Sequence, residues 1–338
     1  MPPHPHGIIT SLVTAALGRE AGDHALSALA IDPALTDESG PAVSRAAFAI
    51  AMNVLLFHDL LARVPSGRAY VADTLARGGR VSFDHGALRT VRLAKGPTGA
   101  LPAGEAAFTR ILRPLGYERA GVYPLDRLKM TGRAYSHADR PEAIPQFFLS
   151  ELHVDRFDAE FAAAADRIFG TSRDPLDGGA RAVLDAYAAG APVSLAMAVA
   201  ALPVIVAAFD RQHAPPAVDD YLLLLSRSDE AAWMATEGNA FNHATDRVAD
   251  VAALAQRLRA EGWPIKDRVE ISRTGRVRQT AFRADAVTRR FAGGETRTVP
   301  GSFYEFISRD IDPETGRLDL AFDTGNATGI FAMTSAPR

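Results

Sequence analysis

The stretch Val81-Ser-Phe-Asp-His-Gly-Ala-Leu-Arg-Thr-Val-Arg-Leu93 carries the strongest fold signal in this chain. Its alternation of apolar and polar residues predicts a β-strand. Since side chains alternate across a strand, His85, Ala87 and Arg89 share one face. At the usual rise per residue, Arg89 starts about 13 Å along the strand from His85. A ligand held at His85, with an anionic tail towards Arg89, would fill that gap. The alternative is a hydrogen-bonded strand histidine beside a solvated arginine.

The rest of the chain divides into helical and strand-like stretches. The apolar spacing predicts helices at 7–30, 43–64, 66–78, 104–115, 156–169, 176–189, 191–211, 217–237 and 246–261. Further strands are predicted at 121–124, 147–154 and 302–309, with a polar loop at 135–145 and a hairpin at 269–283 that turns at Thr274-Gly275.

Helices and strands are therefore segregated along the chain, which favours an α+β fold over a doubly wound parallel sheet. The length allows one large domain or two modest ones, and we expect a single domain over residues 1–338. Residues 7–80 would be its helical N-terminal part, and 156–237 a helical insertion. Residues 81–155 and 238–310 would form a β-rich core. No Gly-x-Gly-x-x-Gly follows a strand and no Walker motif is present, so nothing indicates nucleotide binding.

Two further residues are candidate metal ligands. His243 lies in Gly238-Asn-Ala-Phe-Asn-His-Ala-Thr-Asp246, where Gly and Asn favour a turned backbone and Asp246 is a candidate cap for the next helix. Glu305 lies in a strand whose two faces are both apolar, so its carboxylate must be paired, protonated or metal-bound. The alternatives are a capping or surface role for His243 and an arginine partner for Glu305.

Composition narrows the function classes. The chain has no cysteine, which excludes a thiolate metal site and disulfides and fits a cytoplasmic protein. With 47% hydrophobic and 23% charged residues, it resembles an ordinary globular protein. The net charge of -3 gives no electrostatic reason to expect nucleic acid or a membrane as partner.

The sequence also gives no indication of a membrane segment. The apolar run 193–209 is shorter than a typical transmembrane helix and predicts a buried helix. The N-terminus shows no secretory leader pattern.

Several stretches resemble one family. They are Asp84-His-Gly-Ala-Leu-Arg-Thr90, Ser136-His-Ala-Asp-Arg-Pro-Glu-Ala-Ile-Pro-Gln-Phe-Phe-Leu-Ser-Glu-Leu152, Asn239-Ala-Phe-Asn-His-Ala-Thr245, Gly275-Arg-Val-Arg-Gln-Thr-Ala-Phe-Arg-Ala-Asp285 and Gly301-Ser-Phe-Tyr-Glu-Phe-Ile307. They look like the 2-oxoadipate dioxygenase/decarboxylase family, which is related to vicinal-oxygen-chelate proteins such as 4-hydroxyphenylpyruvate dioxygenase and hydroxymandelate synthase. The resemblance implies a strongly curved β-sheet around a metal.

The resemblance also implies a site. Fe(II) would be held by His85, His243 and Glu305, a ligand set that leaves positions open. Arg89 would bind and orient the distal carboxylate of a 2-oxo dicarboxylic acid. As a hypothesis built on this chemistry, Gln279, together with Ser272 or Arg273, would contact the substrate carboxylate from the hairpin.

The implied reaction converts 2-oxoadipate and O₂ into 2-hydroxyglutarate and CO₂, a step of lysine catabolism. One alternative is a metal-dependent isomerase or lyase of glyoxalase type, and another is a non-catalytic module that binds a small acid. His137 and His153 are weaker candidates for the site, and Asn326–Phe331 is a candidate for the pocket wall.

Overall fold

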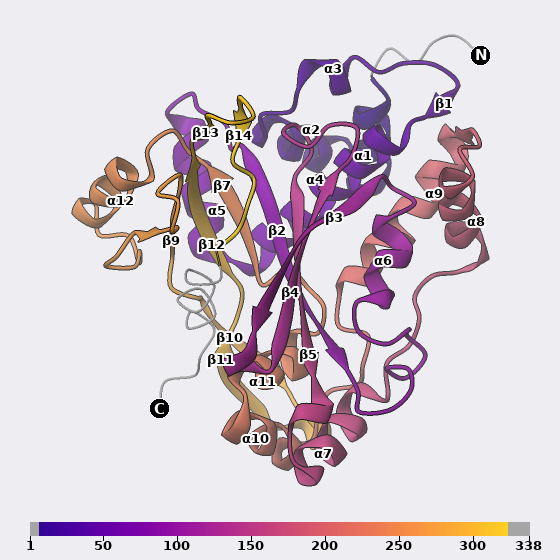
Figure 1. Ribbon diagram of the computed structural model, residues 1–338. Coiled ribbons are helices and arrows are strands. Elements are labelled where there is room, and N and C mark those ends of the chain that lie inside the picture. The colour runs from indigo at the N-terminus through magenta and orange to yellow at the C-terminus, as the bar shows by residue number, and fades with distance from the viewer. Residues whose placement is uncertain (1–6, 324–338) are drawn as a thin grey trace.

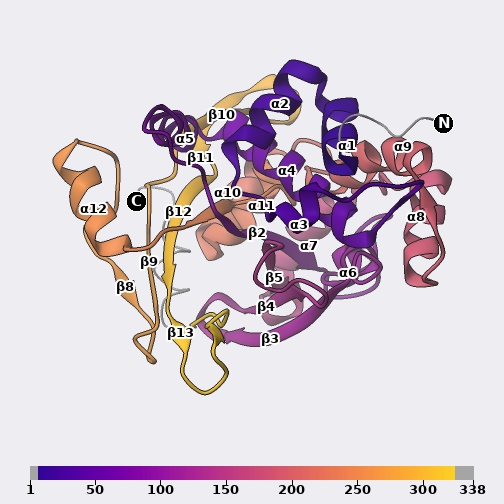
Figure 2. The same ribbon diagram turned by 90° about the horizontal axis from the view of Figure 1, so that it is seen from above.

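The computed structural model describes residues 7–323, and its centre is one curved sheet of eight strands (Figure 1). In spatial order, the strands are β3 (Tyr117–Leu125), β4 (Met130–His137), β5 (Gln146–His153), β2 (Phe83–Arg92), β7 (His243–Arg247), β12 (Phe303–Arg309), β9 (Val277–Ala281) and β8 (Glu270–Ile271). Seen from above, the sheet curls into a half-barrel (Figure 2). The α+β prediction is confirmed.

Helices surround the sheet on its outer side and at one end. They are α1 (Ile8–Leu17), α2 (Arg19–Ala28), α3 (Pro33–Thr36), α4 (Arg45–Arg63), α5 (Pro65–Ala76), α6 (Ala106–Leu112), α7 (Ala159–Phe169), α8 (Gly178–Ala188), α9 (Leu195–Val206), α10 (Val218–Arg227), α11 (Asp229–Glu237) and α12 (Val251–Ala260). Short strands form three separate antiparallel pairs: β1 (Ala42–Val43) with β6 (Val193–Ser194), β10 (Ala286–Arg290) with β11 (Thr296–Pro300), and β13 (Ile311–Asp312) with β14 (Arg317–Leu318).

The register of the central strands places the candidate ligands side by side. Strand β2 pairs antiparallel with β7, so that His85 lies opposite Thr245 and Ala87 opposite His243. Strand β7 pairs in parallel with β12, which sets Glu305 opposite Thr245. Directly opposed residues point to the same side of a sheet. The three candidate ligands therefore come from three adjacent strands.

Aromatic packing holds the convex side of these strands against α4 and α5. Phe57 of α4 contacts Phe83 and Tyr304, and Tyr70 of α5 contacts Tyr304 and Phe306. By length and composition, α4 is apolar enough to cross a membrane, but 67% of its apolar window is buried inside the protein. A core helix passes the same test, and the continuous run of buried residues from Ala47 to Phe57 accounts for the apolar character of α4.

Helices pack against the concave side of the sheet at one end of the half-barrel. Val91 and Leu152 join a cluster with residues of α7, α10 and α11, which closes the lower end of the half-barrel in Figure 1. Above that cluster, Ala87 and Phe148 pack with Phe322 from the segment that follows β14. Along β2, Arg89 lies between these two clusters and His85 lies on the other side of Ala87, so polar side chains on the concave face flank Ala87 on both sides.

Some local predictions are wrong. The helix predicted at 7–30 is two helices, because Gly18 adopts a positive φ of 82°. The stretch 217–237 is also two helices, with Ser228 capping the second. Residues 135–137, predicted as loop, belong to β4. Asp246 is not the cap of the next helix, since it is buried in β7 and Asp250 caps α12 instead.

Candidate metal centre

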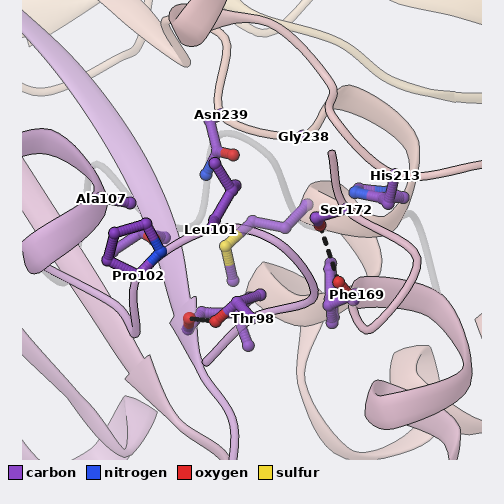
Figure 3. Close-up of a pocket in the computed structure, with 12 residues that line it drawn as sticks. Thr98, Leu101, Pro102, Ala107, Phe169, Ser172, His213, Gly238 and Asn239 are labelled. Carbon is purple, nitrogen blue, oxygen red and sulfur yellow. Dashed lines mark hydrogen bonds between the residues drawn. The ribbon is translucent and has the colours of Figure 1, made fainter. Parts of the chain in front are cut away.

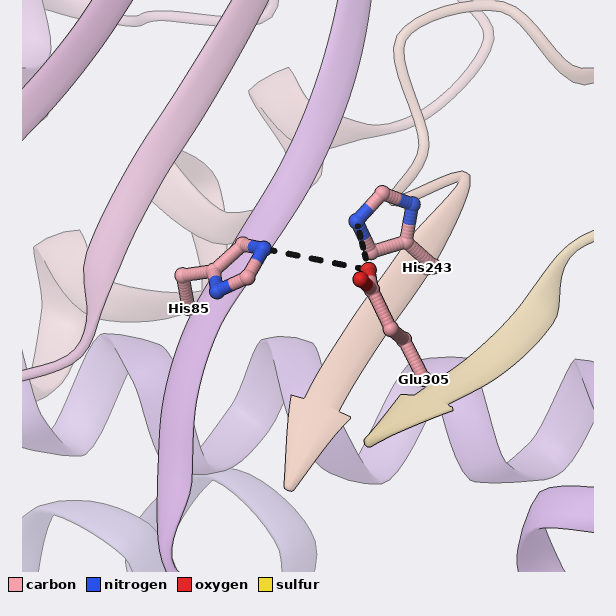
Figure 4. A group of neighbouring side chains, drawn as sticks. All are labelled: His85, His243 and Glu305. Carbon is pink, nitrogen blue, oxygen red and sulfur yellow. Dashed lines mark ion pairs between the residues drawn. The ribbon is translucent and has the colours of Figure 1, made fainter. Parts of the chain in front are cut away.

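His85, His243 and Glu305 meet on the concave face of the sheet (Figure 4). Each offers one ligand atom, and these three atoms lie within 4.8 Å of one another. The distance from His243 Nε2 to Glu305 Oε2 is 2.9 Å, and that from His85 Nε2 to the same oxygen is 3.9 Å. The Thr245 hydroxyl donates to Glu305 Oε2 at 3.1 Å and lies 3.1 Å from His85 Nε2. The convergence that spacing alone left open is therefore present in the structure.

A buried ion pair positions His85. Asp84 Oδ1 lies 2.8 Å from His85 Nδ1, and the Arg309 guanidinium donates to both oxygens of Asp84 at 2.9 to 3.1 Å. Burial alone would raise the pKa of Asp84, but the charge of Arg309 together with the hydrogen bonds to His85 and Arg309 outweighs it, and the pKa lies well below its ordinary value. The Asp84 carboxylate therefore fixes the His85 ring with Nε2 towards the site, as partners of metal-ligating histidines commonly do.

His243 is held by its neighbour in the chain. The Asn242 amide nitrogen lies 3.1 Å from His243 Nδ1, while Asn242 Oδ1 is buried with no hydrogen-bond partner. Turning the amide by half a revolution would let Oδ1 accept from Nδ1–H and free the Nε2 lone pair. Burial lowers the pKa of His243, opposed by the charge of Glu305. The ring is therefore kept in the neutral form that ligates metals.

Glu305 provides the test of whether a metal fits. Its side chain is fully buried, and Oε1 has no hydrogen-bond partner. Burial alone would raise the pKa of Glu305, but its interactions with His243, His85 and Thr245 together hold it below its ordinary value, which favours the carboxylate form. A buried carboxylate with an unsatisfied oxygen is costly. Two imidazoles and a carboxylate are a common donor set for a divalent transition metal, so these residues fit one.

Arg89 lies further along the same face of β2. It is 1% exposed, and its guanidinium lies over the Trp233 ring at 4.9 Å. Burial lowers the pKa of Arg89 to about 10, partly offset by the charges of Glu230 and Asp229. The side chain therefore stays cationic at neutral pH. A fixed cation on the metal-bearing face can hold an anionic group of a ligand.

A family model described as 2-oxoadipate dioxygenase/decarboxylase matches residues 66–318. The chain belongs to this family. An Arabidopsis thaliana relative of that name, described as chloroplastic, is 29% identical over 140 residues, which cover 35% of this chain and 38% of the relative. A rice relative is 30% identical over 145 residues, which cover 36% of this chain and again 38% of the relative. The matched region thus spans well under half of the curated plant relatives.

Solved structures support the fold. A glyoxalase-superfamily protein from Ralstonia eutropha is 52% identical with a TM-score of 0.89, covering 95% of this chain and 99% of that one. Hydroxyglutarate synthase from Oryza sativa, crystallised with 2-oxoadipate, is 20% identical with a TM-score of 0.68, covering 88% of this chain and 96% of that one. The predicted vicinal-oxygen-chelate-like fold is confirmed. Together with the His-His-Glu group, it indicates a metal site.

The other predicted residues of this family member lie at different places. Gln279 is buried on β9 opposite Ile307 of β12. The Ser272 hydroxyl accepts from the Val277 N–H at 3.1 Å and so closes the hairpin turn. The side chain of Arg273 is 90% exposed. Asn326–Phe331 lies outside the described residues.

The two weaker histidine candidates do not join the metal group. His137 packs on Tyr117, and His153 is hydrogen-bonded to Thr131. Sequence reasoning missed Asp84 and Asn242 as positioning residues. The available signal was that each immediately precedes a candidate histidine.

A separate small cavity lies beside the end of β2, where Thr90 and Val91 line it (Figure 3). It is lined by Thr90, Val91, Thr98, Leu101, Pro102, Ala107, Phe169, Ser172, His213, Met234, Gly238 and Asn239. His213 is bonded to the Ala235 carbonyl there, and burial lowers its pKa to about 4. The lining residues include no Arg or Lys, so this cavity offers no cationic side chain to bind a carboxylate of a dicarboxylic acid.

Proposed function

We propose that the protein is an Fe(II)-dependent dioxygenase and decarboxylase that converts 2-oxoadipate and O₂ into 2-hydroxyglutarate and CO₂. The observation that carries the proposal is the convergence of His85, His243 and Glu305 on one face, with Glu305 Oε1 unsatisfied, in a member of this family. The reaction balances, because one oxygen atom of O₂ enters the new carboxylate at the former keto carbon and the other becomes the hydroxyl group, while CO₂ leaves with the two oxygens of the original carboxylate. The rice structure with 2-oxoadipate supports the choice of substrate.

The donor set favours iron over zinc as the resident ion. Two histidines and a carboxylate on one side of an ion are typical of non-haem Fe(II) oxygenases, in which the remaining positions stay open. When bound, Fe(II) would supply the redox chemistry that joins the 2-oxo acid to O₂. Asp84 and Asn242 would keep both imidazoles oriented with Nε2 towards the ion.

We propose that Arg89 binds the distal carboxylate of the substrate. Its planar guanidinium can donate two parallel charge-assisted hydrogen bonds, and the Trp233 ring beneath it limits its movement. About 13 Å of strand separates the starts of Arg89 and His85, room for two long side chains and a six-carbon acid between them. Gln279, on the same side of the sheet as Glu305, is a second candidate contact, and Ser272 a third.

The glyoxalase-type alternative receives less support from this site. Such isomerases and lyases tend to need a fourth protein ligand. Within residues 7–323, the group that could hold a metal contains two histidines and one glutamate only. The non-catalytic alternative predicts that His243→Ala leaves ligand affinity unchanged, whereas our proposal predicts its loss.

We further propose that residues 1–338 act as one metalloenzyme domain in the cytoplasm, with the 2-oxo acid and O₂ as small-molecule partners and no nucleic acid or membrane. The absence of cysteine and the net charge of -3 support this assignment. Its proposed division is a β-rich core at 81–155 and 238–310, with helical parts at 7–80 and 156–237.

Reconstitution tests the proposal. Metal-stripped protein loaded anaerobically with Fe(II) should consume O₂ when 2-oxoadipate is added, and release CO₂ and 2-hydroxyglutarate in equal amounts. Arg89→Lys keeps the charge but loses the fork, and should lower kcat/KM by about tenfold or more. Full turnover of 2-oxoadipate with Zn²⁺ or Ni²⁺ in the absence of O₂ would overturn the oxygenase assignment.

A further inference from the structure

Gln146 is a buried amide without hydrogen bonds. Its side chain lies at the start of β5, the residue is 1% exposed, and neither Nε2 nor Oε1 has a partner. Buried polar groups are almost always satisfied in folded proteins, and each unsatisfied one destabilises the fold. An amide left unsatisfied on both sides therefore calls for a partner that the chain itself does not supply.

The register of β5 shows which way Gln146 points. It lies opposite His85 in the parallel ladder between β2 and β5, and opposed residues share a face. The next residue, Phe147, packs on Phe209 and Phe241 on the convex side. Phe148 packs on Phe322 on the concave side. By alternation, Gln146 lies on the concave face, beside the metal group.

The position of Gln146 separates it from Arg89. Ser150, four residues along β5, is the residue opposite Arg89. Gln146 and Arg89 thus lie about 13 Å apart along the strand direction, Gln146 level with His85 and Arg89 at the far end. A neutral amide is a weak competitor for a transition metal beside two imidazoles and a carboxylate. Its chemistry suits an oxygen of a bound ligand instead.

We propose that Gln146 binds the 2-oxo carboxylate end of the substrate, with Nε2–H donating to a carboxylate or keto oxygen. This inference rests on the proposed function. 2-Oxoadipate has a carboxylate at each end, so a site must distinguish them to bring the keto group to the metal. The Arg89 guanidinium at one end and the Gln146 amide at the other make that distinction. Oε1 of Gln146 remains able to accept from the hydroxyl group of the product.

Gln146→Met tests the inference, because Met has the same unbranched length and no hydrogen-bonding groups. Binding is measured by anaerobic calorimetry on Ni²⁺-loaded protein with 2-oxoadipate and with 2-oxohexanoate, which lacks the distal carboxylate. We expect the Kd of both acids to rise by the same factor, about tenfold or more. Ni²⁺ affinity should stay within about twofold, and the melting temperature of the metal-free protein should stay equal or rise. Gln256→Met, on the exposed face of α12, is the matched control and should change nothing.

Each other outcome has a distinct meaning. If the wild-type protein binds neither acid, the proposed function fails. If it binds both but Gln146→Met binds them as tightly, the inference about Gln146 fails alone. A loss of affinity for 2-oxoadipate only would assign Gln146 to the distal end and overturn it. A lower melting temperature in the metal-free variant would make Gln146 a structural residue and overturn it also.

Discussion

Replacing Arg309 by methionine should destabilise the protein far more than an ordinary ion-pair mutation. The Arg309 and Asp84 side chains are 0% and 1% exposed. Beyond its bonds to Asp84, Arg309 donates to the carbonyl oxygens of Asp319 and Ala321 at 2.9 Å each. Methionine keeps most of the aliphatic stem but removes every donor. Asp84 would then keep His85 and a longer contact of 3.9 Å to Arg247.

The magnitude follows from the uncompensated charge. Removing one partner of a buried ion pair typically costs about 3–5 kcal/mol, because the other charge is left buried without compensation. The two lost carbonyl contacts add to that cost. In an Asp84→Asn/Arg309→Met double variant neither member of the pair is charged, so roughly half of the loss should be recovered. Such recovery is the signature of a coupled pair.

Urea unfolding of the metal-free protein, followed by circular dichroism at pH 7, measures these free energies. Arg276→Met is the control, since Arg276 also binds the segment after β14, through Asp319 at 2.7 Å, but is 30% exposed. It should cost about 1 kcal/mol or less. The reasoning is refuted if Arg309→Met costs no more than Arg276→Met, or if the double variant is as unstable as Arg309→Met alone.

Three further predictions come from other parts of the same sheet. Burial raises the pKa of Asp246 to about 7, so the folded protein keeps a proton that the unfolded chain releases above its ordinary value of 3.8. Stability is therefore lost as pH rises from about 4 to 7, by up to about 4 kcal/mol, and Asp246→Asn should stabilise the protein more at pH 8 than at pH 5 in urea unfolding. A Cβ at Gly86 would lie 2.2 Å from Phe241 Cζ, so Gly86→Ala should cost about 1–3 kcal/mol in the same assay. Phe322 packs edge-on against His85 at 4.8 Å. Phe322→Ala should speed removal of Ni²⁺ by a chelator and cost about 2 kcal/mol, and an unchanged removal rate would contradict a covering role.

The sequence predicts local geometry well at this site because strand alternation is a local property. His85 and Arg89 share a face wherever β2 pairs, and Glu305 is buried between apolar neighbours whatever lies opposite. The choice of strand partners is not local. That β7 lies between β2 and β12 depends on packing across the whole chain. The convergence of the three ligands could therefore be predicted only from the family resemblance, and not from their spacing in the sequence.

The misplaced helix boundaries have a different cause. Apolar periodicity continues through Gly18 and Ser228, but a positive φ at Gly18 and the capping hydroxyl of Ser228 begin new helices there. The partners of buried polar groups could not be predicted from the sequence either. Arg309 meets Asp84 across the sheet, and no pattern near either residue indicates the other.

The unsatisfied groups on the concave face link function to stability. Glu305 Oε1 and both amide atoms of Gln146 are buried without partners, while the convex face is packed with aromatic rings. The metal-free fold therefore carries a cost at this face, of the order of 1–3 kcal/mol for each unsatisfied group, that metal and ligand can remove. Since a ligand stabilises the state it binds, loading the site should raise the unfolding free energy by its binding term. A variant such as Gln146→Met removes part of the cost without the ligand, and should keep or gain stability while losing affinity. A loss of affinity without a loss of stability distinguishes a ligand-directed group from a structural one.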